Sequence, residues 1–298
     1  MNASFGVELE FSILEPDGKL ALMSSPYIVD KYISKELNIT TELGSFQIEL
    51  NPGPWDLSRT GIMSGIKNLK DQVDLLEKVV RKEGFRLSSL TMPVIIDNEV
   101  LNSKNFFTKS DRYLATAKYF SSRGSKIHFK DSSNIILKGE QAVALINEIH
   151  IHIRLSDAKS NLQLFNILNK QGYNLARNFL SHITINGKEL SDECTTMHLF
   201  ECANGEYDKN NHFRRVSFLP YEISNYSEYL SICEGFNRIP ILDGKSFLPI
   251  EDTVYFWVRL RGDKDDFRIE YRCIDMTYNW ESTIIKFLTL PCISQYYM

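Results

Sequence analysis

The alternation of apolar and polar residues predicts a β-strand almost at the start of the chain. Over residues 5–11 the bulky apolar side chains share one face, and Gly6, Glu8 and Glu10 share the other. Two carboxylates on one strand face repel each other unless protons or cations lie between them. The pattern therefore indicates a strand that packs on a core with one face, while its other face is either solvated or binds metal. We take metal binding as the working hypothesis.

Two later stretches repeat this arrangement. Residues 42–50 are expected to form a strand with Glu49 on its polar face. Residues 148–154 alternate strictly, with isoleucines on the opposite face. The polar face of this second strand carries Glu148, His150, His152 and Arg154. A solvated edge strand explains a single histidine, but this combination on one face favours a functional site.

A hairpin near the C-terminus adds positive charge. Residues 254–261 and 267–274 are predicted to be its strands, joined by a turn at Gly262. The polar faces of the two strands include Arg259, Arg261, Arg268, Glu270 and Arg272. A ladder of solvated cross-strand ion pairs is the ordinary alternative, and such ladders contribute little stability.

Helical spacing of apolar residues separates these strands. The predicted helices cover residues 26–37, 58–83, 111–122, 157–181 and 226–236. A small hairpin is expected over residues 126–137 with its turn at 131–133, and residues 183–210 are expected to be turn-rich excursions over the site. Together the elements predict an α+β fold. We expect a curved, mainly antiparallel sheet with helices packed on its outer face and an open, charged, concave front.

Composition limits the class of protein. A chain of 298 residues with 43% hydrophobic and 24% charged residues can bury a full core, and because we detect no linker we expect one domain over residues 1–298. The net charge of −4 argues against nucleic-acid binding, and no apolar run is long enough to span a membrane. We find no signal peptide and five irregularly spaced cysteines, which favours a cytoplasmic protein with reduced thiols.

The charged side chains suggest phosphoryl-transfer chemistry. Carboxylates with one or two histidines suit Mg²⁺ or Mn²⁺ better than a structural zinc ion. Arginines supply planar forks for phosphate oxygens. The sequence has neither a GxxxxGK[ST] nor a GxGxxG motif. The phosphates would therefore be held by side chains and metal ions rather than by a backbone loop.

The order of these segments resembles the glutamate–cysteine ligase-like carboxylate–amine ligases, which have the glutamine synthetase/guanidino kinase fold. The matching stretches are Gly6-Val7-Glu8-Leu9-Glu10-Phe11, Glu42 with Gln47-Ile48-Glu49-Leu50-Asn51-Pro52, Asp111-Arg112-Tyr113 with Tyr119 and Gly124, His150-Ile151-His152, Trp257-Val258-Arg259, and Arg268-Ile269-Glu270-Tyr271-Arg272 with Asp275. The resemblance implies a glutamine synthetase-like catalytic domain with a sheet curved around an ATP and metal site.

The resemblance also implies a role for each residue. It makes Glu8, Glu10, Glu49, His150 and Glu270 metal ligands. Nucleotide contacts are assigned to His150, His152, Arg259, Arg268 and Arg272, and the catalytic set is Arg259, Arg272 and Glu49. The implied reaction phosphorylates a glutamate-like carboxylate with ATP. An amine then attacks the acyl phosphate to give an amide, usually of the γ-glutamyl type, and no protein nucleophile is needed.

The sequence departs from the family pattern in two places. Glu148 stands two residues before His150, where members usually carry glycine. It either adds a carboxylate on the metal-facing side or tilts the strand locally, and both alternatives leave the pose of the nucleotide open. The sequence ends 23 residues after Asp275, whereas members continue through further helices. A second copy of the chain in a homo-oligomer could cover the site. The resemblance implies cysteine as the amine substrate only as the family default, and the residues of this sequence leave the acceptor open.

Three other functions remain open at this point. A phosphotransferase of the same fold would phosphorylate a small nitrogen compound and release no free phosphate. A catalytically inactive module would bind nucleotide only, and it would be expected to have lost metal-binding glutamates. A globular α+β protein with solvated charged strands would require the same pattern to arise by coincidence on several strands.

Overall fold

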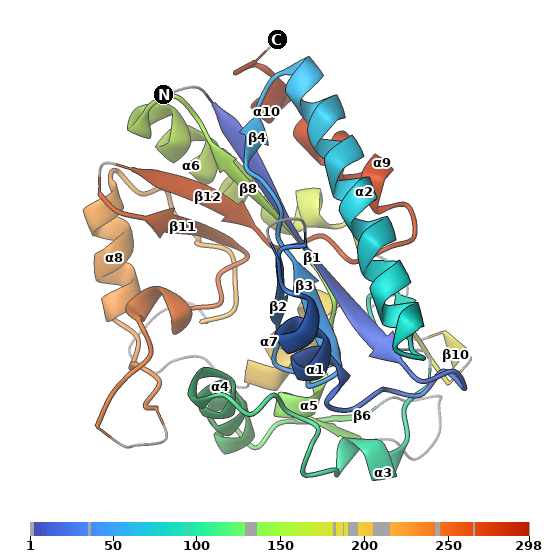
Figure 1. Cartoon of the computed structure of the whole chain (residues 1–298). Coiled ribbons are helices and arrows are strands. Elements are labelled where there is room, and N and C mark those ends of the chain that lie inside the picture. The colour runs from blue at the N-terminus through green and yellow to red at the C-terminus, as the bar shows by residue number, and fades with distance from the viewer. Residues whose placement is uncertain are drawn as a thin grey trace.

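An antiparallel sheet forms the centre of the computed structural model, which describes residues 3–34, 37–93, 95–128, 136–180, 183–186, 188–189, 196–204, 215–241, 245–264 and 266–297. The strand order is β11-β12-β8-β1-β3-β2, and β4 and β5 pair with the two ends of β1 (Figure 1). All of these ladders are antiparallel. The strands are β1 (Ser4–Leu14), β2 (Ile39–Thr41), β3 (Gln47–Leu50), β4 (Trp55–Asp56), β5 (Arg86–Ser88), β8 (Ile149–Arg154), β11 (Val258–Gly262) and β12 (Phe267–Tyr271).

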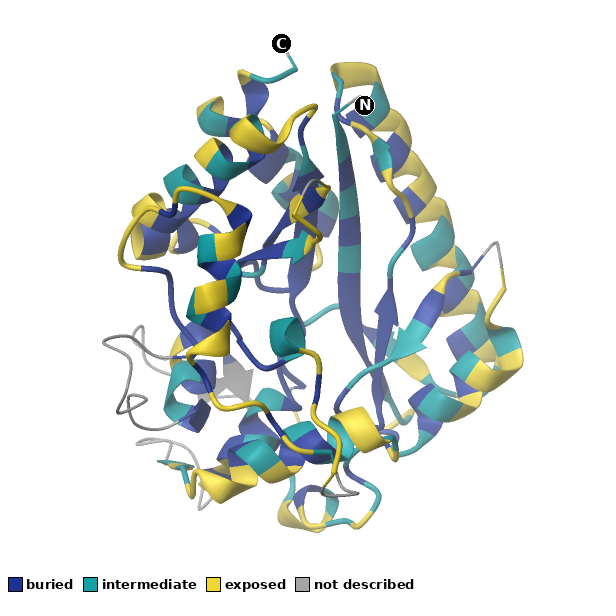
Figure 2. Ribbon diagram, turned by 90° about the vertical axis from the view of Figure 1, so that its left-hand side faces the viewer, coloured by how far each residue is buried: buried dark blue, intermediate teal, exposed yellow. Residues whose placement is uncertain are grey.

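Helices cover the apolar face of the sheet, as the alternation predicts. Along one side run α2 (Arg59–Lys82) and α9 (Trp280–Leu288), and α6 (Ala158–Ala176) contacts β11 and β12 (Figure 1). Gly65 of α2 lets the helix approach closely, because a Cβ there would come within 2.9 Å of the Phe5 and Trp55 rings. Figure 2 shows the sheet buried and the outer turns of the helices exposed. The α+β class and the mainly antiparallel sheet are confirmed.

A second group of helices lies toward the other, charged face. These helices are α4 (Asp111–Ser122), α5 (Gly139–Val143) and α7 (Thr196–Asn204), which contact one another (Figure 1). The remaining elements are α1 (Ser24–Tyr32), α3 (Asn98–Leu101), α8 (Tyr226–Glu234), α10 (Pro291–Ser294), the 3₁₀ turn η1 (Ile250–Asp252), and the two-stranded pairs β6 (Lys126–His128) with β7 (Ile136–Lys138) and β9 (Thr184–Ile185) with β10 (Lys188–Glu189).

Most predicted helices form with small shifts in their ends. The helix expected over residues 26–37 ends at Tyr32, and the one over 157–181 is broken at Gly172, where φ is 45° and ψ is −129°. Helix α9 is an element that the pattern of the sequence did not predict. The turn-rich character expected for residues 183–210 is wrong for residues 196–204, because they form α7 and bury Phe200. The turn expected at residues 131–133 lies outside the described residues.

Two predicted strands are shorter than the alternation suggested. Residues 42–50 are not continuous, because a turn closed by the Gln47 amide and the Gly44 carbonyl (2.8 Å) separates β2 from β3. Residues 254–256 lie outside the ladder with β12, which ends at the pair of Val258 and Tyr271. The amide of Tyr255 instead donates to the Arg215 carbonyl at 3.1 Å. The strand at this end therefore begins at Val258.

Two expectations from composition concern membrane spans and thiols. Within the described part of the chain, no helix has both the length and the apolar character needed to cross a membrane. Cys202, Cys233, Cys273 and Cys292 form no disulfide bonds, in agreement with the expected reduced thiols. Cys194 lies outside the described residues.

Candidate active site

The pairing of the central strands brings the predicted acidic residues together. Along β1 and β8, Glu8 pairs with His150, and along β1 and β3, Glu10 pairs with Glu49. Paired residues of antiparallel strands point to the same face of a sheet. Three strands that are distant in sequence therefore present these four side chains to one space.

Glu270 organises the arginines on the other side of the same face. It pairs with Arg259 on β11, and Arg259 donates to both carboxylate oxygens, at 3.2 and 2.5 Å. The Nε atoms of Arg261 and Arg272 each lie 3.4 Å from one of these oxygens. Glu270 is only 2% exposed. Burial alone would raise its pKa, but Arg259, His152 and Arg272 together hold it well below the usual range.

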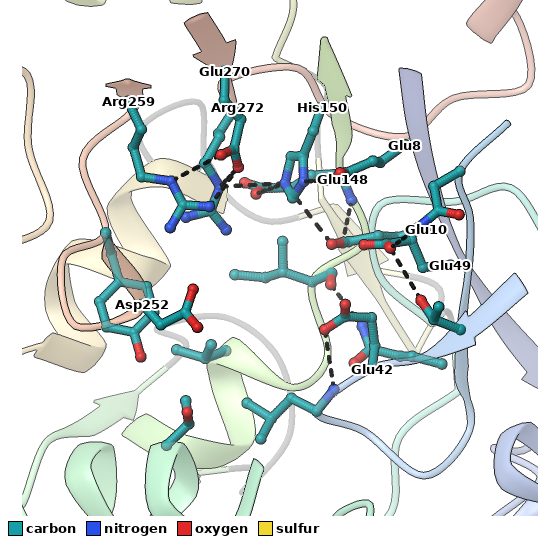
Figure 3. A pocket seen from close by; sticks show the side chains of 18 of the residues that line it. Glu8, Glu10, Glu42, Glu49, Glu148, His150, Asp252, Arg259, Glu270 and Arg272 are labelled. Carbon is teal, nitrogen blue, oxygen red and sulfur yellow. Dashed lines mark hydrogen bonds and ion pairs between the residues drawn. The ribbon is translucent and has the colours of Figure 1, made fainter. Parts of the chain in front are cut away.

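The acidic and basic groups enclose a cavity of about 480 Å³ (Figure 3). Its far wall is formed by α4, by Phe200 of α7, and by Asp252 and Tyr255. The charged front was expected to be open to solvent, but Glu10 and Glu49 are each 8% exposed and His150 is 4% exposed. The expectation of an open front was wrong, because helices and a loop from elsewhere in the chain cover it.

His150 lies among carboxylates in this structure. Its Nδ1 is 3.0 Å from Glu8, and its Nε2 is 3.2 Å from Glu148 and 3.8 Å from Glu10. Burial by itself would lower the pKa of His150, but the charge of Glu10 and the hydrogen bonds to Glu148 and Glu8 raise it well above the usual range. Although burial opposes this, the two histidines hold the pKa of Glu8 well below its usual range.

His152 has a different hydrogen-bonding pattern. Its Nδ1 accepts a hydrogen bond from Arg268 Nε at 3.1 Å. Its Nε2 lies 2.9 Å from Glu8 but is not aligned for a hydrogen bond with it. An imidazole that accepts at Nδ1 carries a proton on Nε2, and Nε2 can then donate a hydrogen bond to an anion.

Three groups of side chains have ligand atoms close enough to share a cation. Each group has its potential ligand atoms within 4.8 Å of one another. The groups are Glu8 with Glu49 and His150, Glu10 with Glu42 and Glu49, and Glu8 with His152 and Glu270. Because the donors are mostly carboxylate oxygens, the residues fit Mg²⁺ or Mn²⁺.

Glu10, Glu42 and Glu49 lie so close together that they can all be ionised only if positive charge is present. Burial, reinforced by the charges of Glu148 and Glu49, raises the pKa of Glu10 to about 8. Burial and the charge of Glu10 raise the pKa of Glu42 to about 7. The pKa of Glu49 is raised well above its usual value, mainly by burial. Without a cation, these groups retain protons that bound metal would displace.

The metal-free protein is expected to lose stability as the pH rises from about 5 to about 8. Glu10 and Glu42 have raised pKa values in the folded state, so between pH 4.5 and about 7–8 the folded chain binds more protons than the unfolded chain. Stability then falls with pH, and the raised pKa of His150 acts in the same direction. Thermal unfolding in chelator tests this, and excess Mg²⁺ should reverse the trend. A melting temperature that rises with pH in chelator would contradict it.

A groove of about 450 Å³ continues the cavity at one end of β1. It shares Glu8, Asn51, His152 and Arg268 with the cavity. Its outer part is lined by Arg154, the start of β1 and the loop formed by residues 51–54. The groove forms because β1 pairs with β4 only at residues 4–5 and with β3 only from residue 9. The cavity and groove together form one elongated site with acids at its centre.

Comparison with known proteins addresses the fold. No protein-family model matches the sequence, and a search of curated proteins found no match. Among solved structures, a bifunctional glutathione synthetase from Pasteurella multocida superposes with a TM-score of 0.56 at 15% identity, over 100% of this chain and 38% of the synthetase chain. A glutamate–cysteine ligase from Francisella tularensis, in complex with AMP, superposes with a TM-score of 0.52 at 14% identity, over 99% of this chain and 67% of the ligase chain. The chain has a glutamate–cysteine ligase-like fold. The resemblance seen in the sequence is thus confirmed for the fold.

Within this ligase-like fold, all nine residues predicted for the site line the same cavity. They are Glu8, Glu10, Glu49, His150, His152, Arg259, Arg268, Glu270 and Arg272. Their roles toward metal, nucleotide and substrate stay predictions. The cavity is also lined by four residues that were not predicted for the site, namely Glu42, Asn51, Arg112 and Asp252.

The missed residues left different signals in the sequence. Glu42, Asn51 and Arg112 belong to stretches that carried the family resemblance, so their positions were visible there. Strict alternation over residues 42–50 would place Glu42 on the opposite face from Glu49. The turn closed by Gly44 and Gln47 interrupts this alternation, and Glu42 lines the cavity together with Glu49. Asp252 belongs to a short 3₁₀ turn and left no periodic signal.

Proposed function

We propose that the chain is an ATP- and Mg²⁺-dependent carboxylate–amine ligase with a single glutamine synthetase-like catalytic domain over residues 1–298. Its product is an amide of the γ-glutamyl type, made through an acyl phosphate. The observation that carries this proposal is the cavity itself. Carboxylates line one side of it, arginines line another, and a groove continues from it along one end of β1. The substrates are a glutamate-like carboxylate and a small amine.

The groove suits the nucleotide. Along β8, residues on one face follow one another at about 6.6 Å. A nucleotide with its base near Arg154 would therefore pass its phosphates along His152 toward His150. Arg268 lies beside His152, and Arg272 Nε lies 3.5 Å from His150 Nε2. Arg268 and Arg272 then bind phosphate oxygens, and His152 donates a hydrogen bond from Nε2.

The carboxylates of the cavity suit the metal ions, with Mg²⁺ preferred and Mn²⁺ as an alternative. Glu8, Glu10, Glu42 and Glu49 are the main ligands in this proposal. His150 becomes a further ligand if one of its ring nitrogens gives up its contact with Glu8 or Glu148 and binds the metal instead. Glu270 faces N–H groups of three arginines, so it becomes a ligand only by giving up one of these contacts. Bound metal would neutralise the triphosphate and the acids.

The reaction then proceeds in two transfers. The γ-phosphoryl group moves from ATP to an oxygen of the substrate carboxylate, and ADP is the leaving group. Arg259 and Arg272 hold the oxygens of the phosphoryl group, and the ion pairs with Glu270 keep their guanidinium groups in position. The amine attacks the acyl carbon, the carbon–nitrogen bond forms, and phosphate leaves.

Phosphate release from Mg-ATP, screened across amino acids singly and in pairs with mass spectrometry of the products, tests this proposal. Release that needs both a carboxylate and an amine, with a new amide mass, is the expected result. A phosphorylated product without phosphate release would replace the ligase with a phosphotransferase. Tight Mg-ATP binding without turnover across the whole screen would indicate a nucleotide-binding module instead.

Arg272→Lys is expected to lower the rate by on the order of 10²-fold or more. The guanidinium offers two parallel donors to a phosphoryl group, and an ammonium group is a point charge that cannot reproduce this fork. Steady-state phosphate release measures the loss. Arg81→Lys is the control, because that side chain is 77% exposed on α2. A rate for Arg272→Lys within a few-fold of wild type would exclude Arg272 from the phosphate site.

A further inference from the structure

Glu148 is a buried carboxylate that the reaction outlined above does not use. It immediately precedes β8 and is 3% exposed. Its backbone is fixed against β1, because its amide donates to Glu10 Oε2 at 2.9 Å and its carbonyl accepts from the Glu10 amide at 3.1 Å. Its carboxylate therefore has a defined place in the cavity, beside His150 (Figure 3).

The position of Glu148 along β8 relates it to the reacting atoms. Arg154, His152, His150 and Glu148 follow one another on one face of the strand. The groove opens at the Arg154 end, so Glu148 lies about 6.6 Å further in than His150. If the γ-phosphate lies between His150 and Arg272, Glu148 is beyond it, on the side where the acyl group and the incoming amine must meet.

The surroundings of Glu148 are suited to a small organic cation. Hydrocarbon side chains of Val143, Ile146 and Phe200 line the same cavity. Among the described residues, the hydrogen bond recorded for the Glu148 carboxylate uses Oε2, with His150 as its partner. This leaves Oε1 for a ligand. A carboxylate beside apolar groups attracts a positive charge more strongly than one in water.

We propose that Glu148 binds the amine substrate as its ammonium ion, which makes protonated primary amines and ammonia the acceptor class. This deepens the proposed function and rests on it. The amine nitrogen forms the bond to the acyl carbon, and the bond from that carbon to the phosphate oxygen breaks. Of the three ammonium protons of a primary amine, one stays on the amide nitrogen, one leaves with the phosphate and one passes to water.

Competition between a charged and an uncharged acceptor tests the proposal. Methylammonium carries a positive charge at neutral pH, whereas hydroxylamine is uncharged and traps acyl phosphates as hydroxamates. The carboxylate is the one identified by the phosphate-release screen. In Glu148→Gln, the ratio of kcat/KM for methylammonium to kcat/KM for hydroxylamine is expected to fall by on the order of 10²-fold. Most of the change should appear as a raised KM for methylammonium.

A matched variant and the ratio for the two acceptors distinguish an amine-binding role of Glu148 from a purely structural role. Glu140→Gln on α5 removes a nearby carboxylate that does not line the cavity, and it should leave the ratio unchanged. If Glu148 merely holds His150 in place, both acceptors lose rate equally and the ratio stays constant, which would overturn the proposal. Absence of any hydroxamate or amide from wild-type protein would instead overturn the ligase function itself.

Discussion

Replacing Glu8 by glutamine is expected to lower Mg²⁺-dependent phosphate release by on the order of 10³-fold or more. Glu8 belongs to two of the three groups of potential ligands and contacts both site histidines. Glutamine keeps the shape of the side chain but removes the negative charge that a divalent cation requires. The loss should appear both as a lower rate at saturating Mg²⁺ and as a weaker affinity for Mn²⁺.

The control for this variant is Glu77→Gln, which removes an exposed carboxylate from α2. It should retain wild-type rate and metal affinity. Thermal unfolding of both variants in chelator shows whether each is folded. A folded Glu8→Gln protein with wild-type turnover and metal affinity would remove Glu8, and with it the central metal position, from the proposed site.

Glu270→Gln is expected to destabilise the fold by about 3–5 kcal/mol and to abolish turnover. Glu270 is buried, and N–H groups of Arg259, Arg261 and Arg272 face its two oxygens. Glutamine has one acceptor oxygen and brings an NH₂ group toward these cations, so positive charge is left buried without compensation. Urea unfolding measures the stability difference, and phosphate release measures the activity.

A surface ion pair provides the comparison for this variant. Glu281 pairs with Lys70 at 3.0 Å, with both side chains substantially exposed, so Glu281→Gln should cost about 1 kcal/mol or less. If Glu270→Gln costs no more than this surface change, the arginines do not depend on Glu270 for their charge balance. Glu270 would then not be the residue that positions Arg259, Arg261 and Arg272.

Local patterns predicted most of the candidate site correctly. In a strand, neighbouring side chains point to opposite faces, so alternation alone placed Glu8 and Glu10 on one face of the first strand and His150 and His152 on one face of β8. The same reasoning placed Glu270 and Arg272 on one face of the second hairpin strand and its continuation. These assignments needed no knowledge of which strands are neighbours.

Local patterns failed where the chain leaves a regular ladder. The turn between β2 and β3 shifts the alternation, so Glu42 faces the same space as Glu49 although its position predicted the opposite face. The alternation of residues 254–261 predicted one strand, but the amide of Tyr255 donates to the carbonyl of Arg215 rather than to β12. The partner of an extended segment depends on what lies beside it in space, and a single-strand pattern carries no such information.

The sequence by itself determined the secondary structure of the central strands, the chemical character of each strand face and the set of acids, histidines and arginines available for a site. Only the tertiary structure decided that this face is buried, that Glu270 is shared by three arginines and that Glu148 lies against His150. The physical reason is that burial, ion pairing and pKa depend on groups brought together from distant parts of the chain. The order of residues along one strand specifies only which side chains share its face.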